Sequence, residues 1–89
     1  MRRIVPLDLQ LVTPERELVH EKVDEVQIPG KDGFLGILPG HAALLGQLGS
    51  GVLSYRADCH QRQVTVRSGF LEVLDDHVRV LADAAEKVE

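Results

Sequence analysis

The sequence predicts an all-β protein, a small flattened β-sandwich of about eight to ten short strands with at most a short helical turn at its C-terminal end. Apolar and polar residues alternate in several short segments, which is the pattern of strands with one buried face. Turn-forming residues separate these segments at intervals of roughly 8–12 residues. Aromatic residues make up only 3% of the chain, so the core must be aliphatic.

The N-terminal part of the chain contains three predicted strands. Residues 7–12 alternate, with three leucines on one face, and Pro14 ends the strand because proline cannot donate to a β-ladder. A second short segment covers residues 17–22. Residues 23–28 alternate again until Pro29 and the glycine after it stop the run.

The next stretch, from Gly30 to Leu45, is the one around which the rest is organised. It holds four of the chain's eight glycines. Glycine permits positive φ and close backbone approach, so the stretch is predicted to form a turn, a short strand, a second turn and a compact apolar segment from Ala42 to Leu45. A segment so rich in glycine needs neighbouring strands to hold its shape.

The C-terminal part alternates again. Strands are predicted over residues 52–57, 64–67, 70–74 and 78–82, with a flexible corner at residues 49–51 and polar turns at residues 58–61 and 75–76. Gly69 interrupts the pattern and fits a β-bulge. Only residues 82–89 look helical, and about two turns of helix are marginal alone.

Length and charge limit the functional classes. Eighty-nine residues without an internal repeat indicate one domain over residues 1–89. The net charge of −4 argues against nucleic acid and against an anionic membrane surface. One cysteine, Cys59, cannot form an internal disulfide. No apolar run approaches the roughly 18 residues of a membrane span, and the basic start lacks the apolar core of a signal peptide.

Motifs for chemistry are weak. Gly30, Gly33 and Gly36 have neither the spacing nor the following helix of a dinucleotide-binding loop. No nucleophile, base and orienting group converge. These patterns alone indicate a small β-domain that binds something. A small metal- or ligand-binding enzyme domain stays open as an alternative, and its candidate residues are Asp32, His41, Cys59 and His60.

One run of residues carries a family resemblance. Residues 33–45, Gly-Phe-Leu-Gly-Ile-Leu-Pro-Gly-His-Ala-Ala-Leu-Leu, resemble the G-x-L-G-I-x-P-G-H-A-P-L-L motif of the epsilon subunit of F-type ATP synthases. Segments 11–15, 68–73 and 78–86 also match the family in the right order. Ala43 replaces the usual proline, and Phe34 stands where an acidic residue is common. Ala84 replaces the usual threonine.

The resemblance implies a rotor subunit that is not itself an enzyme and needs no cofactor or metal. In the family, the sandwich clamps the foot of the gamma subunit and rests on the polar loops of the c-ring. It thereby couples proton- or sodium-driven rotation to ATP synthesis. The implied location is the cytoplasmic face of the bacterial inner membrane, or the equivalent organelle face, with membrane contact only through the complex.

Residue positions follow from the same motif match. By resemblance, the gamma interface includes Thr13, His41, Leu45 and Gly46, and the c-ring interface includes Lys31, Asp32 and Phe34. Phe34 could instead turn inward and fill the core, and the sequence leaves both orientations open.

The family usually continues into a C-terminal hairpin of two helices, whereas this chain ends at Glu89. We therefore expect the sandwich domain without the hairpin, either as a natural short form or as a truncation. The hairpin is the part that binds ATP in some bacteria and blocks hydrolysis. The expectation is that this chain does neither.

Overall fold

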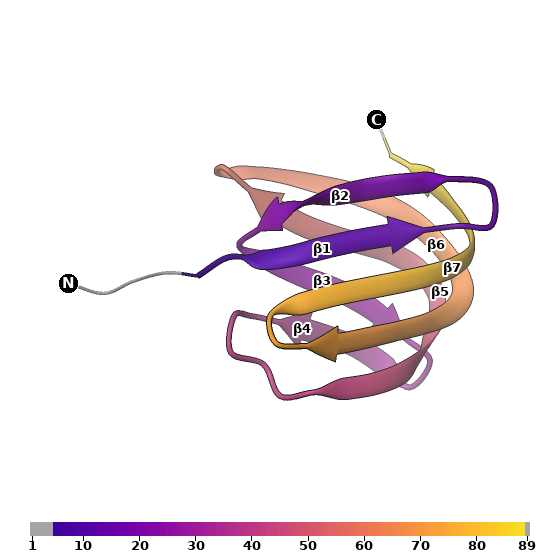
Figure 1. Ribbon diagram of the computed structural model, residues 1–89. Coiled ribbons are helices and arrows are strands. Elements are labelled where there is room, and N and C mark those ends of the chain that lie inside the picture. The colour runs from indigo at the N-terminus through magenta and orange to yellow at the C-terminus, as the bar shows by residue number, and fades with distance from the viewer. Residues whose placement is uncertain (1–4, 89) are drawn as a thin grey trace.

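The computed structural model of the chain describes residues 5–88. Within these residues all regular secondary structure is β-strand, without a helix. The strands form one seven-stranded sheet in the order β2-β1-β7-β6-β5-β3-β4 (Figure 1). All neighbouring strands are antiparallel except β1 and β7, which run parallel. The strands are β1 (Leu7–Val12), β2 (Glu17–Val23), β3 (Glu25–Gly30), β4 (Gly33–Ile37), β5 (Leu44–Ala57), β6 (His60–Leu74) and β7 (His77–Lys87).

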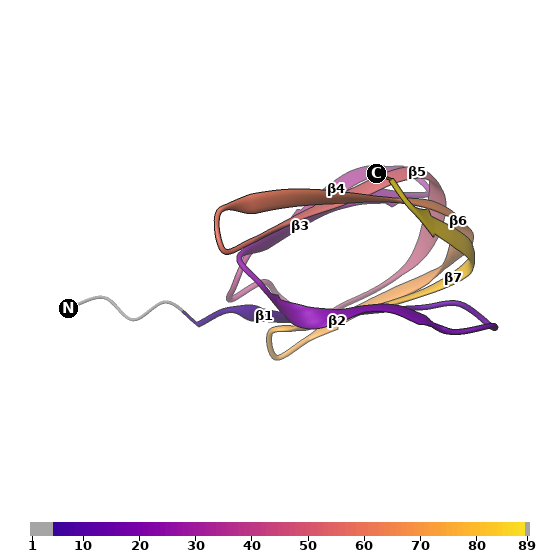
Figure 2. The ribbon, with the colours of Figure 1, turned by 90° about the horizontal axis from the view of Figure 1, so that it is seen from above.

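The sheet folds over on itself into two layers (Figure 2). Strands β5, β6 and β7 are long, and each bends from one layer into the other. Their halves nearest the β6–β7 turn lie with β1 and β2, and the other halves lie with β3 and β4. Each layer therefore contains five segments, and the roughly eight to ten short strands expected from the sequence are these segments. The predicted sandwich is confirmed, but six of the segments are joined into three strands.

The bend of β6 occurs without a change in its register. Gly69 has a φ of 132° and Ser68 a φ of 52°, yet the pairing of β6 with β7 keeps the same register before and after them, from Arg67↔Ala84 to Gly69↔Ala82. The β-bulge expected at Gly69 is therefore wrong: the strand changes direction by backbone conformation, without an extra residue. A Cβ at Gly69 would clash with the carbonyl oxygen of Leu81, so only glycine fits this bend.

The corner expected at residues 49–51 lies inside β5. There a Cβ on Gly49 would come within 2.8 Å of the carbonyl oxygen of Gly30. The glycine therefore lets the end of β3 approach β5 closely, at the irregularity in their antiparallel pairing between Gln27 and Gly30. The corner is a bend in a continuous strand and does not separate two strands.

The helical turn expected over residues 82–89 is also wrong as far as residue 87. Strand β7 continues to Lys87, with Val66 facing Ala85 and Val64 facing Lys87. Long β6 offers a hydrogen-bonding partner along this whole segment. A helix of about two turns is marginal in water, because most of its backbone N–H and C=O groups lie at its ends and have no partner within the helix.

The core between the layers is aliphatic, as predicted. Leu7, Leu9 and Leu11 of β1 are fully buried. They belong to the same core cluster as the alternating buried valines of β6 and β7. Among the aromatic residues, Tyr55 is in the core with 4% of its surface exposed. Phe34 and Phe70 are 66% and 60% exposed. The inward orientation of Phe34 is therefore excluded.

Two hairpin turns have the same backbone geometry. Asp58 and Cys59 connect β5 to β6, and Asp75 and Asp76 connect β6 to β7, each as a two-residue turn. All four residues have positive φ, between 48° and 65°. Positive φ at both central residues is what a type I′ hairpin requires, and aspartate tolerates it better than most residues. The predicted polar turns are confirmed.

Candidate functional site

The β3–β4 hairpin folds against the beginning of β5. Its turn is held there by the backbone N–H of Lys31, which donates to the carbonyl oxygen of Gln47 at 3.0 Å. A Cβ on Gly30 would lie 2.8 Å from the carbonyl oxygen of Gly33, so the turn can be this tight because residue 30 is glycine. The glycines noted in the sequence thus bring two separate segments together.

These two segments enclose an open hollow of about 400 Å³, which we call the β4–β5 hollow. Its rim carries two large apolar side chains, Phe34 and Leu45, which are 66% and 79% exposed. A second hollow of about 410 Å³ shares Leu44 and Leu45 with it. The residues that line the β4–β5 hollow are Gly30, Lys31, Asp32, Gly33, Phe34, Leu35, Leu44, Leu45, Gly46 and Gln47.

The hollow therefore unites residues that the family resemblance assigns to two different partners. Leu45 and Gly46 belong to the predicted gamma interface, and Lys31, Asp32 and Phe34 belong to the predicted c-ring interface. Exposed apolar side chains next to glycine leave a surface onto which another chain can pack closely. The two predicted contact sets adjoin on one face.

The connection from β4 to β5, residues 38–43, is not a strand. Its His41 N–H donates to the carbonyl oxygen of Leu38 at 3.1 Å, and the Gly40 N–H donates to the Asp76 carboxylate at 2.7 Å. The imidazole Nδ1 of His41 lies 2.7 Å from the carbonyl oxygen of Ala42. A carbonyl oxygen can only accept, so Nδ1 donates there. His41 is half-buried.

The compact apolar segment expected over residues 42–45 is packed only at Leu44, which is half-buried against the core. Ala42, Ala43 and Leu45 are exposed. The prediction followed the apolar composition, but these residues lie where the chain enters β5 from an irregular connection. Their exposure extends the apolar surface of the β4–β5 hollow.

Thr13 is not part of this surface. Its side chain is 7% exposed, and its hydroxyl donates to the Arg16 carbonyl oxygen and accepts from the Arg16 N–H, at 3.2 and 3.3 Å. These bonds close the β1–β2 turn. Strands β7 and β6 lie between β1 and β5. About three interstrand spacings, or roughly 14 Å, therefore separate β1, which Thr13 follows, from β5, which contains Leu45.

The residues of the metal-binding alternative are not brought together. His41 lies just before β5 begins, whereas Cys59 and His60 follow its end, fourteen residues of strand away. Asp32 is in the exposed β3–β4 turn. Within residues 5–88, no group of three or more His, Cys, Asp or Glu side chains could hold a metal ion. The alternative is not supported.

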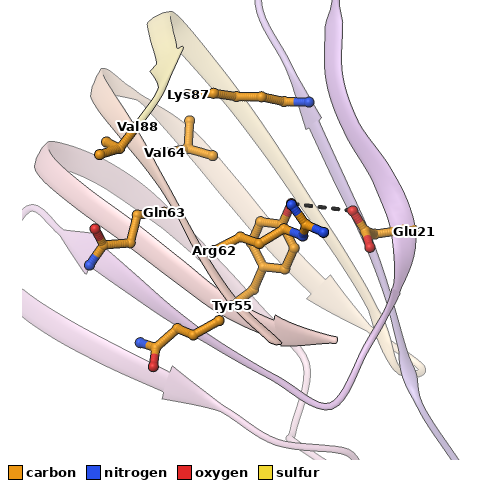
Figure 3. Close-up of a pocket in the computed structure, with 8 residues that line it drawn as sticks. Glu21, Tyr55, Arg62, Gln63, Val64, Lys87 and Val88 are labelled. Carbon is orange, nitrogen blue, oxygen red and sulfur yellow. Dashed lines mark hydrogen bonds between the residues drawn. The ribbon is translucent and has the colours of Figure 1, made fainter. Parts of the chain in front are cut away.

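A wider hollow of about 670 Å³ opens between β2 and the beginning of β6, with Tyr55 of β5 and the C-terminal end of β7 also lining it (Figure 3). The Tyr55 hydroxyl donates to the Glu21 carboxylate across it, at 3.2 Å. Burial, followed by the negative charge of Glu21, raises the pKa of Tyr55. Charges of both signs line the hollow, including Arg62 and Lys87. No sequence pattern pointed to the Tyr55–Glu21 contact, because 34 residues separate its partners.

A small charge cluster ties β1 to its neighbours. Lys22 on β2 donates to the Asp8 carboxylate at 2.9 Å, and the Nδ1 of His77 on β7 lies 3.6 Å from the other carboxylate oxygen. The hydrogen bond from Lys22 is the main reason why the pKa of Asp8 is lowered.

Within residues 5–88, no helix is long and apolar enough to cross a membrane.

Comparison with known proteins identifies the family. Residues 6–88 match the family model described as "ATP synthase, Delta/Epsilon chain, beta-sandwich domain". The chain belongs to this family. It is 60% identical over 83 residues to the ATP synthase epsilon chain of Solibacter usitatus, and 44% identical over 82 residues to that of Koribacter versatilis. These matches cover 93% and 92% of this chain but 62% and 58% of the relatives. The chain thus spans about 60% of their length.

Solved structures show the same sandwich. A chain of the Euglena gracilis mitochondrial ATP synthase, determined as an OSCP/F1/c-ring assembly, superposes with a TM-score of 0.87 at 26% identity. The match covers 97% of this chain and 56% of that one. A chain of the Tetrahymena thermophila central stalk and c-ring shares the fold, with a TM-score of 0.76 at 16% identity over 94% of this chain and 68% of that one. The sandwich of the epsilon family is therefore the fold of this chain.

Proposed function

We propose that this chain is a non-catalytic central-stalk subunit of an F-type ATP synthase, joining the gamma subunit to the c-ring. The observation that carries the proposal is the 60% identity to an ATP synthase epsilon chain over 83 residues. The subunit would couple rotation of the ring, driven by protons or sodium ions, to ATP synthesis elsewhere in the complex. It would be peripheral, on the cytoplasmic face of the bacterial inner membrane or its organelle equivalent.

The geometry of the β4–β5 hollow supports this proposal. Leu45 is 79% exposed, and Phe34 lies on the rim of the same hollow. Folding alone leaves these side chains in water, whereas an obligate partner would cover them, typically over well more than about 1,000 Å². We place gamma at His41, Leu45 and Gly46 and the ring at Lys31, Asp32 and Phe34. Thr13 is left out because its side chain is buried. The two partners then meet at the hollow.

A copurification experiment tests the function directly. The tagged chain, recovered from the membranes of its own cells, should bring gamma and the c-ring with it. Recovery of neither partner would refute the proposal. The enzyme subunits should be recovered in the fixed ratio of a complex, which distinguishes assembly from incidental adhesion.

Leu45→Asp tests the placement of gamma. A charge in the desolvated centre of an interface is costly, so this variant should lose gamma while the isolated domain stays folded. Leu45 faces Glu72 across the β5–β6 ladder, and an aspartate there would add a like-charge pair. Leu45→Lys avoids that repulsion and should also lose gamma. Val52→Asp, exposed on the same strand, is the matched control and should bind normally. Gamma binding by folded Leu45→Asp and Leu45→Lys would contradict the placement.

A further inference from the structure

The connection from β4 to β5 has few attachments to the sandwich. Residues 38–43 belong to no strand. Two hydrogen bonds are internal to the connection: the His41 N–H donates to the Leu38 carbonyl oxygen, and the His41 imidazole donates to the Ala42 carbonyl oxygen. The bond that reaches another element is from the Gly40 N–H to the carboxylate of Asp76, at 2.7 Å. Asp76 lies 36 residues further along the chain, in the β6–β7 turn.

Asp76 is itself held firmly in place. Its carbonyl oxygen accepts from the backbone N–H of Asp8 at 2.8 Å, which ties the turn to the start of β1. Its φ of 61° places it at the second central position of the tight hairpin. The carboxylate therefore projects from a rigid turn, and a hydrogen bond from a backbone N–H to a carboxylate is stronger than one between neutral groups.

Gly40 is equally specific to this contact. Its φ of 88° lies in the left-handed region, which side chains other than glycine rarely adopt. Nothing lies within 4 Å of where its Cβ would be, so the glycine serves backbone direction and not close packing. This conformation turns the Gly40 N–H toward Asp76. His41 follows Gly40 directly, and Leu45 comes four residues after His41.

From this geometry we infer that Asp76 is a positioning residue for the partner-binding surface. Its carboxylate anchors the connection that carries His41 into β5 and so presents the rim of the β4–β5 hollow in one conformation before a partner arrives. A segment that is ordered in advance loses less conformational entropy on binding. The inference rests on the proposed function, because it assigns the preorganised surface to gamma.

The neighbouring residue provides a matched control. Asp75 and Asp76 occupy the two central positions of one turn, with φ of 48° and 61°. Glycine adopts positive φ readily, so Asp75→Gly and Asp76→Gly should both retain the hairpin. Within residues 5–88, only the Asp76 side chain bonds to Gly40. Asp76→Asn keeps the hairpin and an acceptor oxygen but removes the charge.

The test measures hydrogen exchange of the Gly40 amide and the affinity of the 89-residue chain for purified gamma subunit. In Asp76→Gly we expect faster exchange at Gly40 and about three- to tenfold weaker binding, the net range for losing one ordinary hydrogen bond, because this bond orders the surface and does not itself cross the interface. Asp76→Asn should recover part of both. Asp75→Gly should match the wild-type chain. A purely structural role of the turn would instead affect Asp75→Gly and Asp76→Gly alike.

Other outcomes overturn the inference. Wild-type exchange at Gly40 in Asp76→Gly would show that the carboxylate does not anchor the connection. Unchanged affinity in Asp76→Gly would show that the anchor does not serve binding, and an equal loss in Asp75→Gly would assign the effect to the turn. If the wild-type chain fails to bind gamma, the proposed function fails and the role of Asp76 toward that partner fails with it. Normal wild-type binding with equal binding by Asp76→Gly overturns the role of Asp76 alone.

Discussion

Two regions of the chain are rich in aliphatic side chains but differ in whether these are buried. One region is strands β1 and β7, and the other is the segment from residue 33 to residue 45. On β1, Leu7, Leu9 and Leu11 are fully buried, and Asp8 and Gln10 between them face outward. In the segment from 33 to 45, Phe34, Leu38 and Leu45 are more than half exposed. Neighbouring strands on both sides enclose β1, whereas β4 is the edge of the sheet.

The difference separates residues that fold the domain from residues that are free for a partner. A buried leucine stabilises the fold by roughly 1.5–3 kcal/mol, whereas an exposed one contributes little until something covers it. The two regions also differ in their glycines. Gly69 sits where β6 crosses between layers, and Gly33 sits beside the hollow. Substitutions in each region should therefore affect different measurements.

The largest effect on stability is expected for Gly69→Ala. Positive φ at a residue with a side chain costs about 1–3 kcal/mol, and the clash of the new Cβ with the Leu81 carbonyl adds about 1–3 kcal/mol of overpacking. Gly33→Ala is the matched control, because its φ is 137° but nothing lies within 4 Å of the new Cβ. Gly69→Ala should melt at least about 4 °C below Gly33→Ala. Equal melting temperatures would mean that the bend at Gly69 can relax.

An intermediate effect, on binding and not on folding, is expected for Phe34→Glu. Because Phe34 is 66% exposed, its melting temperature should barely change. Ile37 on the same strand is fully buried, and Ile37→Glu should lose several kcal/mol of folding free energy, since a charge enters the core. A large drop in the melting temperature of Phe34→Glu would contradict the exposed position.

The same Phe34→Glu variant sharpens the assignment of the ring. An apolar contact by Phe34 should be nearly insensitive to salt, whereas a carboxylate pairing with polar or basic groups weakens as salt screens it. Attachment of the variant to the c-ring should therefore depend more on ionic strength than attachment of the wild-type chain. Identical salt dependence of the two would remove Phe34 from the ring interface.

The smallest effect is expected from acid. The lowered pKa of Asp8 means that its ionised form stabilises the folded state above the ordinary carboxyl pKa. That stabilisation is lost as the pH falls below about 4, through the folded-state pKa. Thermal melts across this range should show a slightly shallower decline for Asp8→Asn than for the wild-type chain. Asp32→Asn, in the exposed β3–β4 turn, should leave the wild-type decline unchanged.

Local patterns in the sequence were enough for the strands with two neighbours. The alternation in β1, and at Val64 and Val66 of β6, predicted which residues are buried. Continuity was harder to predict. Gly69 breaks the pattern in the sequence but only bends a continuous strand, because the ladders on both sides of β6 keep their register.

The candidate site depends on contacts that no local pattern contains. Phe34 is equally compatible with core and surface in the sequence. In β4 the face that packs on the core is the one shared by Leu35 and Ile37, so Phe34 points outward. The family motif drew attention to the stretch around Leu45, but it does not reveal that Thr13 is buried in its own turn. The Asp76–Gly40 bond was not predictable either, because a turn aspartate is explained locally by its positive φ.

The parallel pairing of β1 with β7 sets the order in which the domain can assemble during synthesis. In the sheet, the β1–β2 hairpin joins the other strands through β7, and His77, the partner of Asp8, comes 69 positions later in the chain. At roughly 5–20 residues per second, a ribosome needs roughly 3–14 s to make that length. Throughout this interval β1, with its leucines, can pair only with β2. The first strand to leave the ribosome is thus among the last to be enclosed, and such late, long-range pairing slows folding and prolongs the exposure of apolar surface.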